Sequence, residues 1–139
     1  MTMPAEYRTA AEDFERFLAA ALDESGLATR NQVYTMVQGV FQAFRRRLDV
    51  RDAIRFADAL PPLLRALFVA DWDVDEPKRP FGTREAMTQE VQALRIDHNF
   101  APDTAIRDVA AALRRSVDAS ALDRVLAELP NGARAFWSV

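Results

Sequence analysis

The sequence predicts an all-α protein, a compact helical bundle built from two tandem helical repeats related by a pseudo-twofold axis. Apolar residues recur along most of the 139 residues at the i, i+3, i+4, i+7 spacing of amphipathic helices. The motif LPPLLRALF at 60–68 returns 69 positions later as LPNGARAFW at 129–137. The same offset places apolar on apolar residues elsewhere, as at Val37 and Ile106. Such self-similarity is typical of a duplicated structural unit.

The composition suits one domain with a sizeable core. Half of the residues are hydrophobic, 28 % are charged and only four are glycine, which is typical of a soluble helical protein. Proline, glycine and alternating charge mark one clear linker. We therefore expect a single all-helical domain over 1–139, with repeat one at about 5–70, a linker at 71–82 and repeat two at 83–139.

The first repeat begins with two longer helices. Apolar spacing predicts a helix over 12–22, and Gly26 after it supplies the left-handed conformation of a helix end. Thr29 is a plausible N-cap for the next helix, whose apolar stripe reaches Leu48. This second helix is the longest of the repeat, and we expect it to be central.

Two shorter helices complete the first repeat. Asp49 can cap a third helix, which leads to Leu60. Pro61 and Pro62 end it, because proline lacks the backbone donor and clashes with the preceding turn. Proline is favoured in a first turn, so a short fourth helix restarts there, and it is expected to bury Leu63, Leu64, Leu67 and Phe68.

The second repeat follows the same order. A helix opens at Thr83, another begins near Pro102, Asp118 caps a third, and Pro130 opens a last short helix that ends at Trp137. No strand-like alternation competes with these patterns.

Few residues could carry chemistry. The chain has no cysteine and a single histidine, His98, without a second imidazole or a carboxylate set beside it. Glycine-rich phosphate loops, nucleophile elbows and HExxH are missing. We therefore expect no enzyme, no catalytic or metal-ligating residue and no cofactor. The net charge of −3 predicts no general attraction to nucleic acid or to a membrane. The start of the sequence resembles no signal peptide, and we expect a cytoplasmic protein.

Arginines supply the strongest local positive charge. One run ends the second helix and continues into the third, and a repeated arginine follows each Leu-Pro break. Arginine binds phosphates and carboxylates, but a run at a helix C-terminus also offsets the dipole and pairs with acids. For the repeated Arg65 and Arg134, an ion pair or carbonyl contact that closes each half competes with a duplicated anion-recognition position. We favour the structural interpretation in both cases. The candidate anion contacts are Arg45, Arg46, Arg47, Arg51, Arg55, Arg65 and Arg134.

Large aromatic residues beside the linker and the C-terminus are candidate interface anchors. Such residues often dominate binding energy, although tryptophan equally often covers a small core. A contiguous exposed apolar patch would favour the interface interpretation. The candidate interaction surface consists of Phe68, Trp72, Phe136 and Trp137.

The segment GLATRNQVYTMVQGVFQAFRRRLDVRDAIRFADALPPLLRALFVADWD, 26–73, resembles the bacterial domain-of-unknown-function family 2267, and a looser second copy ends at Leu129-Pro130 and Trp137. The resemblance implies an all-helical fold of two similar halves in a small bacterial cytoplasmic protein. It implies no particular activity and transfers no catalytic residue. The second copy departs from the pattern, because Asn131 and Gly132 stand where the first has Pro62 and Leu63.

Three functions remain open. The leading hypothesis is a non-enzymatic helical module that binds a protein partner or a second copy of itself. The alternative is a carrier of a small apolar ligand with a pocket between the two repeats. Nucleic-acid binding through the arginine-rich helix face is the second alternative, and salt-sensitive affinity would reveal it.

Overall fold

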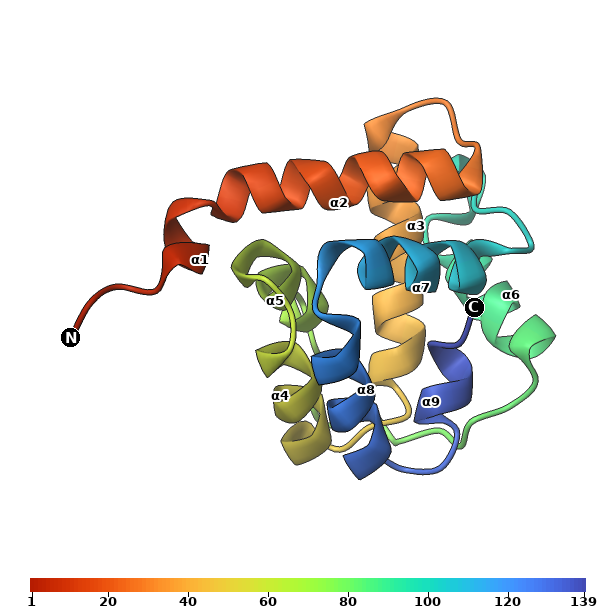
Figure 1. The fold of residues 1–139 in the computed structure, drawn as a ribbon. Helices are drawn as coiled ribbons and strands as arrows, with labels where there is room; N and C mark the ends of the chain where they lie inside the picture. The colour runs from red at the N-terminus through yellow and green to blue at the C-terminus, as the bar shows by residue number, and fades with distance from the viewer.

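The computed structural model describes all 139 residues and contains only helices (Figure 1), which confirms the predicted all-α class. Along the chain they are α1 (Ala5–Arg8), α2 (Ala10–Ser25), α3 (Arg30–Arg45), α4 (Val50–Asp58), α5 (Pro62–Val69), α6 (Arg84–Ala93), the 3₁₀ helix η1 (Ile96–His98), α7 (Ala105–Ser116), α8 (Ala119–Glu128) and α9 (Ala133–Phe136). None of them is long and apolar enough to cross a membrane.

The predicted N-caps start four of the helices. Thr29 accepts a hydrogen bond from the Gln32 backbone N–H at 3.2 Å while the Gln32 side chain accepts from the Thr29 N–H, a complete capping box at α3. Asp49, Thr83 and Asp118 accept in the same way from the first turns of α4, α6 and α8. Each cap satisfies a backbone donor that lacks a partner within the helix.

Other helix ends differ from the sequence-based boundaries. Helix α7 begins at Ala105 rather than near Pro102, because Pro102 first forms a turn in which its carbonyl accepts from the Ala105 N–H. Helix α9 is a single turn, entered through Gly132 at a φ of 105°. Gly26 ends α2 in the predicted left-handed conformation, with φ at 71°. The single turns α1 and η1 were not predicted, because they are too short to show a periodic pattern.

The main helix pairs join the first half of the chain to the second half. Figure 1 shows α3 running through the middle of the bundle, with α2 and α7 crossing over it. Helix α2 packs chiefly on α7, and α6 packs chiefly on α3. At Gly39 the helices α3 and α6 meet so closely that a Cβ would lie 2.8 Å from the Val91 carbonyl oxygen. Glycine is therefore required sterically at the α3–α6 crossing.

Aromatic side chains fill the centre of the bundle. The Phe44 ring on α3 lies 4.8 Å from the Phe56 ring and 5.0 Å from the Phe136 ring, centre to centre. Trp137 stacks on Phe56 at 5.3 Å and meets Phe44 edge to face at 5.3 Å. Edge-to-face and offset pairs are the favoured geometries for such rings. The C-terminal aromatics are thus part of one core with α3 and α4.

Candidate functional site

The predicted interaction surface is wrong for three of its four residues. Phe68 and Trp137 are fully buried and Phe136 is 1 % exposed. The short helices α5 and α9 both turn inward onto α3, where their rings gain more from the shared core than a surface position would provide. Only Trp72 stays partly exposed, and its ring lies 5.4 Å from the Arg45 guanidinium.

Two of the arginines predicted as anion contacts, Arg45 and Arg65, cap helix C-termini. Arg45 donates from Nη1 to the carbonyls of Phe68 and Ala70, at 2.9 and 3.0 Å, at the end of α5. Arg65 donates to the carbonyls of Ala57 and Leu60, at 3.1 and 2.9 Å, at the end of α4. The carbonyls of Phe68, Ala70 and Leu60 accept from no backbone N–H, whereas the Ala57 carbonyl also accepts from the Leu60 N–H at 2.9 Å. Each of these two side chains thus caps the C-terminal end of a neighbouring helix.

A partly buried ion cluster joins the end of α3 to α6. Arg47 binds Glu90 with both ends of its guanidinium, at 2.8 and 2.5 Å, and Arg46 and Arg79 approach the same carboxylate at 3.5 and 3.3 Å. Burial by itself raises the pKa of Glu90, but the Arg47 hydrogen bonds and the three positive charges outweigh it and hold the pKa below its ordinary value. The cluster therefore fixes the second half of the molecule to the first.

The remaining candidates do not join this cluster. Arg51, Arg55 and Arg134 are exposed and make no hydrogen bond or ion pair with the protein. Arg65 and Arg134, which the repeated motif matches, consequently differ in role. The exposed arginines are also separated from Arg45 and Arg47, which are both 6 % exposed, so the predicted arginine-rich face is not continuous at the surface.

A different pair of arginines shows matching contacts at the repeat offset. Arg45 donates to the Phe68 carbonyl, and Arg114 donates from Nε to the Trp137 carbonyl at 3.0 Å. Both the donors and the acceptors lie 69 positions apart in the sequence. The offset of 69 positions is visible in the sequence, but the contacts of these residues depend on how the two short helices α5 and α9 fold back onto the bundle.

An apolar groove lies open to solvent between α2, α3 and α5. It encloses about 340 Å³, and Leu63 and Tyr34 in it are 39 % and 38 % exposed. Sequence reasoning placed Leu63 and Leu67 inside the core. The sequence signal for the groove is the i, i+3, i+4, i+7 spacing of Leu63, Ala66 and Leu67 in α5 and of Ala70 at its C-cap, which marks one continuous face. The lining residues are Phe14, Tyr34, Leu63, Ala66, Leu67 and Ala70.

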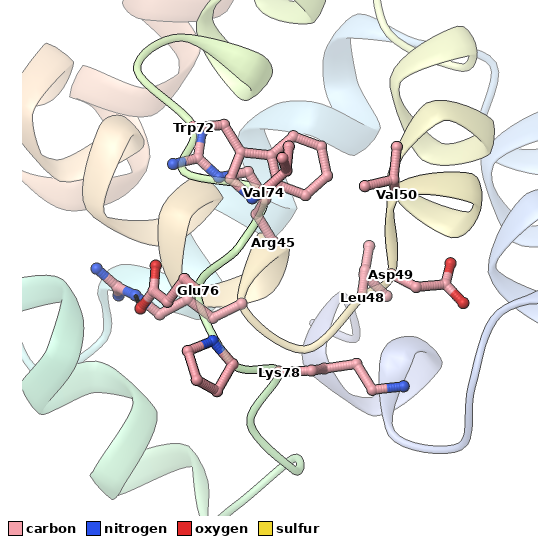
Figure 2. A pocket seen from close by; sticks show the side chains of 10 residues that line it. Arg45, Leu48, Asp49, Val50, Trp72, Val74, Glu76 and Lys78 are labelled. Carbon is pink, nitrogen blue, oxygen red and sulfur yellow. Dashed lines mark ion pairs between the residues drawn. The ribbon is translucent and has the colours of Figure 1, made fainter.

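A second hollow, of about 250 Å³, lies where the segment after α5 passes the end of α3. Figure 2 shows Trp72 and Val74 on one side of it and Leu48 and Val50 on the other. Arg45 forms part of its lining. Burial first, and then the charge of the neighbouring Arg46, lower the pKa of Arg45, while Glu76 and Asp71 act in the opposite direction.

A comparison with models of known protein families identifies the family of this chain. The model of the family described as "Uncharacterized conserved protein (DUF2267)" matches residues 14–136. The chain belongs to this family. The match spans both expected repeats, so the family resemblance inferred from the sequence is confirmed. A comparison with curated proteins finds no match.

Proposed function

We propose that this member of the DUF2267 family is a non-enzymatic helical interaction module of the bacterial cytoplasm, and that it pairs with a second copy of itself. One observation carries the proposal: every residue that lines the α2–α3–α5 groove is hydrophobic, although the groove opens to solvent. Apolar surface gathered in this way is characteristic of interaction sites. Burying it stabilises a complex by about 25 cal/mol per Å² of apolar surface removed from water.

The proposed occupant of the groove is the N-terminal segment, 1–9, of the other copy. This segment contains α1, which has no buried residue, and Figure 1 shows the chain before α1 extending away from the bundle. Met3 and Tyr7 in it are 52 % and 50 % exposed. The exposed apolar side chains of this segment, beside an apolar groove without cover, favour exchange of the segment between two copies, which gives a symmetric contact. The Glu6–Arg65 ion pair, at 3.6 Å within one chain, would then form between the copies.

We also infer that the two halves are pseudo-twofold repeats. The crossed packing of α2 on α7 and of α6 on α3 supports this relation, as do the matching contacts of Arg45 and Arg114. The two alternative functions draw less support. A carrier with a pocket between the repeats would need space that the aromatic rings around Phe44 occupy. Nucleic-acid binding would use the exposed Arg51 and Arg55 without the buried arginines of α3.

The test is the solution mass by light scattering coupled to size exclusion. We expect a dimer for the wild type and a monomer for Leu63→Glu. Leu63 lies in the first turn of α5, where a negative charge is favourable to the helix, so the substitution leaves the fold intact. Ile96→Glu is the matched control, because Ile96 is 71 % exposed and lines neither the groove nor the hollow at Trp72. A monomeric wild type, or a dimer that survives Leu63→Glu, would refute the proposal.

A further inference from the structure

We propose that the hollow beside Trp72 binds a small ligand in which a carboxylate is attached to an apolar group, with the carboxylate on the free donors of Arg45 and the apolar group against Trp72. The site is independent of the groove, and no residue lines both. Failure of the dimer would therefore leave this inference unaffected.

The first step is the donor count at Arg45. A guanidinium has five N–H donors, and Arg45 uses only Nη1, on the carbonyls of Phe68 and Ala70. Its Nε and Nη2 donate to no group of the protein, and no carboxylate lies within ion-pair distance. The residue is nevertheless 6 % exposed and lines the hollow. A buried guanidinium with an unused pair of parallel donors matches the geometry of a carboxylate.

The second step is the contrast with Arg114. Both arginines donate to the carbonyl at the end of a short helix, but Arg114 also donates from Nη2 to Asp123 at 3.0 Å. The position 69 residues before Asp123 holds Ile54, which cannot supply a charge. The same type of arginine thus has a carboxylate partner in one half of the chain and none in the other, and a carboxylate ligand would provide the missing partner.

The third step is the chemistry of the walls. Trp72 is placed at the hollow by Asp71, whose left-handed φ of 55° reverses the chain just after α5. The Trp72 ring lies 5.4 Å from the Arg45 guanidinium, so the apolar wall adjoins the charge. The other apolar side chains of the lining are Leu48, Val50, Val74 and Pro77.

The two acidic residues that line the hollow are engaged with other groups, and Asp71, outside the lining, forms no ion pair with Arg45. Glu76 pairs with Arg46 at 3.5 Å and with Arg79 at 3.7 Å, and Asp49 accepts the Asp52 N–H that caps α4. Lys78, which also lines the hollow (Figure 2), is after Arg45 the second positive residue there that forms no ion pair. The volume of about 250 Å³ lies just below the usual range for drug-sized ligands, which predicts a small aromatic or branched aliphatic monocarboxylate.

Benzoate is the probe, and benzamide is its neutral counterpart. The chain has two tryptophans, one at the hollow and one buried in the core, so the two indole N–H signals in a ¹H–¹⁵N NMR spectrum report on the two places separately. We expect benzoate to shift the Trp72 signal saturably and to leave Trp137 unchanged. Benzamide should bind about tenfold more weakly or worse, because it loses the ionic hydrogen bonds. Equal affinity for the two probes, or no shift at Trp72, would overturn the inference.

Two variants separate binding from folding. Val50→Glu places a negative charge at the hollow and in the first turn of α4, where the helix tolerates it, and should weaken benzoate binding about tenfold. Ile96→Glu, the distant control, should bind benzoate as the wild type does. Arg45→Lys keeps one charge but loses the paired donors, and should also weaken binding. Unchanged benzoate affinity in Val50→Glu, with a preserved spectrum, would contradict the site.

Discussion

The closest helix contact of the bundle can be tested with one methyl group. In Gly39→Ala the added Cβ would lie 2.8 Å from the Val91 carbonyl oxygen and 2.9 Å from Val91 Cγ1. The carbonyl belongs to the α6 backbone and cannot rotate away, so α3 and α6 must separate. Overpacking of this kind typically costs about 1–3 kcal/mol, whereas alanine gains about 1 kcal/mol over glycine in helix propensity. We expect a net loss of about 1 kcal/mol in the free energy of unfolding.

Urea unfolding followed by far-ultraviolet circular dichroism measures this difference. Gly82→Ala is the matched control, because no atom lies within 4 Å of its Cβ position and its φ is not positive, so the substitution should be neutral or slightly stabilising. A Gly39→Ala variant that is more stable than the wild type by the full propensity gain would refute the close approach of α3 and α6.

Four further substitutions test the rest of the fold. Trp137→Ala should lower the free energy of unfolding by about 3–5 kcal/mol, because the ring is fully buried, and a smaller loss in a urea titration would place the ring outside the core. Arg65→Ala should cost about 1–3 kcal/mol, because it removes two hydrogen bonds and leaves the Leu60 carbonyl unpaired, whereas Arg134→Ala should stay within about 0.5 kcal/mol. Equal effects would show that the motif has one role in both copies. The depressed pKa of Glu90 means that its contribution to stability is complete above its ordinary pKa and is lost as the pH falls through the folded-state value. Urea titrations should therefore show a smaller loss of stability below about pH 4.5 in Glu90→Gln than in the wild type, and parallel pH profiles would contradict the Glu90 cluster.

Local patterns in the sequence predicted the helix caps and helix ends, because these features depend only on residues close together in the chain. Thr29 and Asp49 cap helices because the side chain and the backbone donor that it accepts from are three residues apart. Gly26 ends α2 because glycine adopts the left-handed conformation required there without the steric cost that a side chain would add. These features need no knowledge of tertiary structure.

The candidate surface failed because burial of an aromatic residue is set by distant segments. Trp137 meets Phe56 of α4 and Phe44 of α3, more than eighty positions away in the sequence, and nothing near position 137 indicates either contact. The repeated Arg65 and Arg134 misled for a related reason. The two arginines occupy equivalent positions in the repeat. Arg65 on α5 reaches the end of the preceding helix α4, whereas Arg134 on the single turn α9 is exposed.

The sequence did not predict the groove, because its apolar residues have the pattern of a buried helix face. Leu63 and Leu67 match the pattern of a buried helix face, and only the folded chain reveals that no other element covers them on the solvent side. Apolar periodicity predicts that a face is covered, but it does not distinguish cover by the same chain from cover by a partner.

The most direct test of the proposed pairing is a disulfide between two copies. The chain has no cysteine, so each introduced thiol is the only one present. Tyr7→Cys and Ala66→Cys are prepared as separate proteins, mixed under mild oxidation and analysed by mass spectrometry, with Tyr7→Cys mixed with Ile96→Cys as the control. Segment exchange into the groove predicts that the mixed disulfide forms faster with Ala66→Cys than with the control. Equal rates of cross-linking in the two mixtures would contradict it.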